Sequence, residues 1–153
     1  MNELLDAMEF LGKTRRRLRF GKLSRVPLKL LRLEWKVTSV DCDWLMRPAD
    51  PWDKCLPNSV ADKHVSIQAL RDALLLREMV FKAFPNIERA ELRMFRATED
   101  GGLEVMLMGT LSRSDEILQR VPSVAMRAKM CGFRFSLAQG VLESLHSATL
   151  GCV

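Results

Sequence analysis

The chain has 153 residues, of which 48% are hydrophobic and 28% are charged, a composition typical of one ordinary globular domain. No apolar run approaches the roughly 18 residues of a membrane-spanning helix, and the first residues lack the features of a signal peptide. The four cysteines are widely spaced, so neither a disulfide framework nor a zinc site is expected. We therefore expect a cytoplasmic protein with reduced thiols, no metal and no cofactor.

The net charge of +5 arises in one segment. Residues 13–36 carry ten Lys/Arg and one acid, whereas residues 1–12 sum to −3 and residues 37–153 to −1. Such a cluster attracts phosphates, anionic lipid or an acidic protein face, although a solvated basic surface is the alternative. The side chains expected to contact an anionic partner are Lys13, Arg15, Arg16, Arg17, Arg19, Lys22 and Arg25.

In chain order, the first predicted element is an amphipathic helix over residues 2–19. Apolar side chains recur in it at helical spacing, with acids in the first turns and basic residues in the last, as the helix dipole favours. Gly21 is expected to end this helix, and Pro27 prevents any continuation.

Residues 28–46 are predicted to form a hairpin around Thr38-Ser39, because two alternating apolar sets flank that dipeptide. A two-residue turn there would place Lys36 opposite Asp41 as an opposite-charge pair. The two sets that should face the core are Leu31, Leu33, Trp35 and Val37, then Val40, Cys42, Trp44 and Met46.

A proline-punctuated loop over residues 47–57 follows, after which Asn58 or Ser59 is expected to cap a helix. A broad apolar stripe over residues 60–84 predicts the strongest helix of the chain, and Pro85 ends it.

A second hairpin is predicted from residues 89–98 and 103–112, joined through a turn that contains two glycines. Ser114 or Asp115 is expected to open a last helix, which Pro122 interrupts and Gly132 ends. A short strand over residues 133–137 comes next. The C-terminal residues 138–153 are expected to add a small helix.

The predicted order is therefore α-ββ-α-ββ-α-β. Hairpins separated by single helices favour an α+β two-layer sandwich, an antiparallel sheet with helices on one face. We expect a single domain over residues 1–153. It divides into an N-terminal basic helix and connector (1–26), an α+β core (27–137) and a C-terminal segment (138–153).

Three tryptophans and four acids lie close together in the sequence. Trp35 and Trp44 fall on the apolar phase of their strands and are expected in the core, whereas Trp52 in the loop is a candidate contact residue. Nearby basic residues, including those of the 13–36 segment, are expected to form salt bridges with Asp41, Asp43, Asp50 and Asp53.

The predicted strand over residues 103–112 is apolar on both faces near residues 105–108. A helix layer covers only one face of a sheet, so the other requires the N-terminal segment, a second subunit or a ligand. Methionine adapts well to binding surfaces. We therefore expect Phe95, Met106 and Met108 to form a protein interface.

The sequence holds no P-loop, nucleotide-binding glycine fingerprint, GxSxG or HExxH motif, and it has only two histidines. We expect a non-enzymatic binding protein, a small subunit or accessory factor of a larger assembly. Its basic segment would contact an anionic partner, and its Met-bearing face another protein or a second copy.

Two alternatives stay open. The first is an RNA- or DNA-binding module, since nucleic acid ranks slightly ahead of an acidic protein as the anionic partner, with a membrane surface third. The second is a small-molecule-binding or enzymatic domain with a pocket between the sheet and the helix over residues 60–84. The sequence does not specify its ligand.

Overall fold

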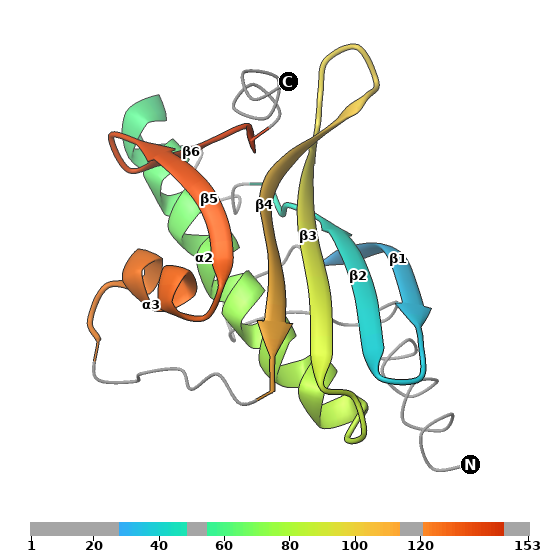
Figure 1. Cartoon of the computed structure of the whole chain (residues 1–153). Coiled ribbons are helices and arrows are strands. Elements are labelled where there is room, and N and C mark those ends of the chain that lie inside the picture. The colour runs from blue at the N-terminus through green and yellow to red at the C-terminus, as the bar shows by residue number, and fades with distance from the viewer. Residues whose placement is uncertain (1–27, 49–54, 114–120, 146–153) are drawn as a thin grey trace.

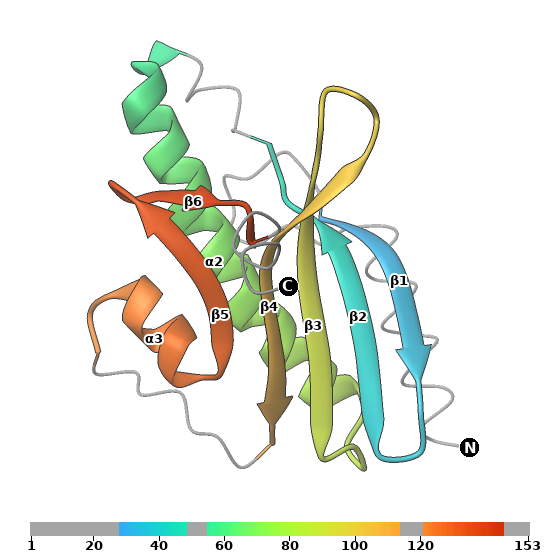
Figure 2. The same cartoon turned by 45° about the horizontal axis from the view of Figure 1, so that its top comes forward.

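The computed structural model describes residues 28–48, 55–113 and 121–145 (Figure 1). One sheet in the order β1-β2-β3-β4-β5-β6 carries two helices, α2 and α3, on one of its faces (Figures 1 and 2). The α+β class is therefore confirmed. The elements are β1 (Lys29–Trp35), β2 (Ser39–Leu45), α2 (Asn58–Ala83), β3 (Arg89–Ala97), β4 (Leu103–Ser112), α3 (Val124–Met130), β5 (Phe133–Ala138) and β6 (Val141–Glu143).

The sheet is mixed, so the expected wholly antiparallel arrangement is wrong. β2 and β3 run parallel, whereas every other neighbouring pair is antiparallel. The reason is the 26-residue helix α2, which carries the chain back along the sheet before β3 begins. A crossover of this length is the usual connection between parallel neighbours.

The observed order, β-β-α-β-β-α-β-β, also differs from the expected one. The predicted helix over residues 2–19 and the helix start at Ser114 or Asp115 lie outside the described residues. Within the segment 138–153, where a small helix was expected, Val141–Glu143 form strand β6, and residues 146–153 lie outside the described residues. Gln139 and Gly140 both have positive φ, 52° and 81°, which is the backbone of a tight hairpin turn. β5 and β6 therefore form an antiparallel hairpin.

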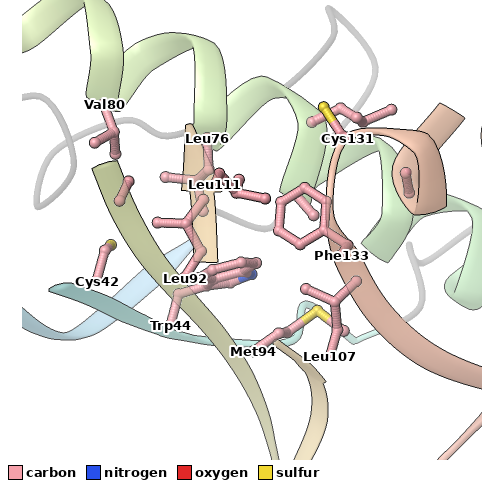
Figure 3. Packing of buried hydrophobic residues seen from close by; sticks show 14 of the residues in the cluster. Cys42, Trp44, Leu76, Val80, Leu92, Met94, Leu107, Leu111, Cys131 and Phe133 are labelled. Atoms are coloured by element: carbon pink, nitrogen blue, oxygen red, sulfur yellow. The ribbon is translucent and has the colours of Figure 1, made fainter. Parts of the chain in front are cut away.

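The core lies between the sheet and the two helices (Figure 3). The apolar stripe predicted for the long helix is buried from Ala69 to Phe84, and Trp44 near the end of β2 is fully buried. Leu92, Met94 and Leu107 from β3 and β4 surround it (Figure 3). The expected core position of Trp44 is therefore confirmed.

Strand β1 contributes less to the core than its alternation predicts. A register irregularity between Leu30 and Arg32 shifts its phase, so Leu31 is partly exposed, and Val37 lies in the turn and is 89% exposed. Trp35 is partly exposed and contacts Phe84, with 5.9 Å between the ring centroids. β1 is consequently an edge strand of the sheet that contributes few side chains to the core.

The two ends of α2 are held differently. Pro57 occupies the N-terminal cap position and no side chain caps this end, so the predicted cap by Asn58 or Ser59 is wrong. Near the C-terminal end, the Arg113 guanidinium donates to the carbonyls of Phe84 and Ile87 at 2.7 and 2.8 Å. A cation at this end complements the helix dipole.

A buried ion pair ties the end of β2 to the middle of α2. The Arg47 guanidinium donates from Nε to Oδ2 of Asp72 at 2.7 Å and from Nη2 to Oδ1 at 2.9 Å. Both residues are almost fully buried. This pair was not predicted, although an acid at position 72, within the apolar stripe of the helix, is the signal that could have revealed it.

Candidate functional site

The face of the sheet opposite α2 and α3 carries a defined set of side chains. Alternation along each strand and the strand register place these residues together, because cross-strand partners lie on the same face. We call this surface the helix-free face, a term that refers to the helices of the described residues. Its members are Lys29, Arg32, Glu34, Asp41, Asp43, Leu45, Arg89, Glu91, Arg93, Phe95, Val105, Met108, Thr110, Ser112 and Arg134.

Asp43 is the centre of an ion-pair network on this face. Arg93 donates from Nε to Oδ1 of Asp43 at 2.9 Å and from Nη2 to Oδ2 at 2.7 Å, and Arg32 donates from Nε to Oδ2 at 3.1 Å. The hydrogen bond to Asp43 raises the pKa of Arg93, so its guanidinium is held charged. The two arginines flank Asp43, which is only 6% exposed.

Asp41 forms the neighbouring ion pair. Lys36 Nζ lies 3.0 Å from Asp41 Oδ2, and Arg32 Nη2 lies 3.6 Å from the same oxygen. The hydrogen bond to Asp41, followed by its charge, raises the pKa of Lys36. The expected Lys36–Asp41 pair thus forms, although the register sets Glu34 directly opposite Asp41.

These contacts confirm the predicted salt bridges of Asp41 and Asp43 with the 13–36 segment. They also show that two basic residues of that segment, Arg32 and Lys36, are partly neutralised within the protein. Arg93 supplies the partner that sequence reasoning missed, because it comes from a strand fifty residues away. Asp50 and Asp53 lie outside the described residues.

Beside the charged network the face becomes apolar. Phe95 is paired with Val105 across β3 and β4, and Met108 lies between Arg93 and Arg134 in a row across β3, β4 and β5. Phe95, Val105 and Met108 are half-buried. The Arg93 guanidinium lies 5.3 Å from the centre of the Phe95 ring, so charge and apolar surface meet there.

The structure places the three predicted interface residues differently from one another. Phe95 and Met108 lie on the helix-free face, but Met106 is 0% exposed and belongs to the core. The cause is a register irregularity in the β3–β4 pair, which leaves Met106 without a cross-strand partner and brings Val105 onto the helix-free face. Val105 therefore takes the surface position expected of Met106.

The remaining predicted contact residues fall outside the described part of the chain. Trp52 lies in the 49–54 segment. The seven basic residues expected to bind an anionic partner lie within residues 1–27. Their role stays a prediction.

Two of the described cysteines are buried and one is exposed. Cys42, Cys55 and Cys131 form no disulfide with one another. Burial raises the pKa of Cys42 to about 12, with the charge of Asp43 as the second cause. Cys42 is therefore a protonated core residue and not a nucleophile.

Neither a metal centre nor a membrane-spanning helix occurs among the described residues. No group of three or more His, Cys, Asp or Glu side chains among them is placed to hold a metal ion. None of their helices is long and apolar enough to cross a membrane.

Comparison with models of protein families, with curated proteins and with solved structures finds no match.

Proposed function

We propose that this chain is a non-enzymatic binding protein of the cytoplasm, a small subunit or accessory factor that docks on a protein partner through its helix-free face. The observation that supports the proposal is the patch of Phe95, Val105 and Met108, bordered by the guanidinium groups of Arg93 and Arg134. Apolar area together with arginine is the composition that protein interfaces favour.

The charges of this face indicate the chemistry of the partner. The acids Asp41 and Asp43 are already paired within the protein. Arg134 is exposed and forms no ion pair with the residues that the structure describes. The charge in the row of Met108 is therefore positive, whereas the exposed Glu91 lies in the neighbouring row, opposite Thr110. A complementary partner presents apolar side chains flanked by carboxylates.

The test is native mass spectrometry of complexes that the tagged full chain forms in its own source. Met108→Glu introduces a carboxylate into the patch, and Met126→Glu is the matched control, because Met126 is exposed on α3. We expect a complex of defined stoichiometry with one protein, which Met108→Glu abolishes and Met126→Glu preserves.

Three results would contradict the proposal. They are the absence of any complex, equal loss with both variants, and a complex that contains nucleic acid but no protein. The last result would favour the nucleic-acid-binding alternative. Circular dichroism of each variant shows that a loss of binding does not arise from unfolding.

A further inference from the structure

Strand β1 leaves one row of backbone hydrogen-bonding groups unused by its neighbour β2. Lys36 donates its backbone N–H to the Ser39 carbonyl at 2.8 Å, so Lys36 and, two residues earlier, Glu34 are directed toward β2. Because direction alternates along a strand, the N–H and C=O groups of Leu33 and Trp35 point away from the sheet. Among the described residues, β2 is the only strand that pairs with β1.

Large apolar side chains are exposed along this edge among the charged ones. Leu31 is 39% exposed and Trp35 is 37% exposed, and Val37 protrudes at the turn. Edge strands are normally protected by charges or bulges. β1 carries the charged residues Lys29, Arg32 and Glu34 and a register irregularity between Leu30 and Arg32, and from Arg32 to Trp35 its register with β2 is regular.

We propose that β1 pairs antiparallel with β1 of a second copy of this chain, around a twofold axis at Leu33. The outward N–H and C=O groups of Leu33 would bond to the same groups of the second copy. On the helix-free face, Arg32 of each copy would lie opposite Glu34 of the other. On the opposite face, Trp35 of each copy would extend toward the first half of the other copy's β1, where the register irregularity lies.

The charges select this register over its neighbours. Within one copy, Arg32 Nη1 already lies 2.7 Å from Glu34 Oε2, so the two groups reach the same height above the sheet. An axis at Arg32 or at Glu34 would place like charges directly opposite each other, which destabilises antiparallel pairs. It would also require backbone groups that β2 already uses. An axis at Trp35 would pair residues of the turn instead of the strand.

The proposal is independent of the partner-binding function, because it uses the sheet edge and not the patch around Met108. Its test is the oligomeric state of the full chain, measured by light scattering with size exclusion over a range of concentrations. We expect a dimer for the wild type. Glu34→Arg should raise the dimer dissociation constant at least tenfold, because two attractive cross-strand pairs become repulsive.

Two further variants define the surface. Glu91→Arg is the matched control, since it makes the same charge change on the same face but on the interior strand β3, and it should leave the dimer intact. Leu33→Pro removes the outward N–H, which β2 does not use, and should produce a folded monomer. Met108→Glu should not affect the dimer.

A wild-type monomer at every concentration would overturn the proposal. A dimer that survives both Glu34→Arg and Leu33→Pro would overturn it equally. Amide hydrogen exchange supplies a second measurement, in which the Leu33 amide should become more protected as the concentration rises. If exchange at Leu33 is independent of concentration, the pairing does not occur.

Discussion

Burial determines the chemistry of Cys42. Because its pKa rises to about 12 from the ordinary 9.0, the thiol stays protonated at neutral pH. We expect a thiol reagent such as DTNB to modify the exposed Cys55 rapidly and Cys42 only after unfolding. Mass spectrometry after a short exposure identifies the modified residue. Rapid modification of Cys42 in the folded protein would contradict its burial.

The same shift makes stability depend on pH. The folded state holds the Cys42 proton more tightly than the unfolded state, so this stabilisation is fully present below about pH 9. It is lost as pH rises from the unfolded pKa toward the folded one, about 12. Chemical denaturation at pH 8 and pH 10.5 measures the loss. Cys42→Ala, which has no thiol to ionise, should lose less free energy of unfolding over the same interval.

The buried Arg47–Asp72 ion pair leads to a prediction about stability. Asp72→Ala would leave the Arg47 guanidinium buried without its carboxylate, which should lower the free energy of unfolding by about 3–5 kcal/mol. Urea denaturation measures this difference. Replacing both partners, as in Arg47→Met with Asp72→Leu, should recover most of it. If the double variant is as unstable as Asp72→Ala, the cost does not come from the unpaired charge.

At the scale of residues, sequence reasoning succeeded where a single alternating pattern decides burial. Val40, Cys42 and Trp44 are all fully buried as expected. It failed for Met106 because a register irregularity between strands leaves no trace in the pattern of one strand. It also missed Arg93, whose partner Asp43 lies on a strand that only the parallel crossover brings beside it.

At the scale of elements, Gly132 ends α3 and starts β5. Its φ is +108°, and an added Cβ would lie 3.1 Å from Leu111 Cδ2. Gly132→Ala should therefore cost about 1–3 kcal/mol of unfolding free energy, from both backbone strain and contact. Gly101→Ala is the matched control, because Gly101 also has positive φ, +86°, but has open space around it. Thermal denaturation should show the larger decrease for Gly132→Ala, and equal decreases would contradict the contact.

The helices and hairpins that the structure describes were predictable within a few residues where the pattern is long and strongly periodic. The hairpin strands β3 and β4 lie within one residue of their predicted bounds. β6 was missed because three residues are too short for a periodic signal, and its turn depends on Gln139 adopting positive φ. The backbone of Leu142 is fixed instead by a tertiary contact, its N–H donating to Ser66 Oγ of α2 at 2.9 Å.

At the scale of the whole molecule, the fold separates two kinds of surface. α2 and α3 cover one face of the sheet and complete the core, while the opposite face combines an ion-pair network with an apolar patch. Sequence reasoning anticipated an apolar area on that face. It could not place the charges around it, because their arrangement depends on the order of the strands.

The charge at the border of the patch leads to a prediction about affinity. Arg134→Glu should weaken binding of the protein partner at least tenfold, the equivalent of about 1.4 kcal/mol, and the remaining affinity should depend less on salt. Arg71→Glu on α2 is the control for net charge and should have little effect. Titration by calorimetry at two salt concentrations provides the comparison. Equal losses for both variants would indicate a general charge effect.

The central question is which face of the sheet contacts the partner. A photo-crosslinking residue at Thr110, which is exposed on the helix-free face, answers this question when compared with one at Glu78 on the exposed side of α2. We predict that position 110 crosslinks to one partner protein and that position 78 does not. Crosslinks from position 78 without any from position 110 would contradict the account.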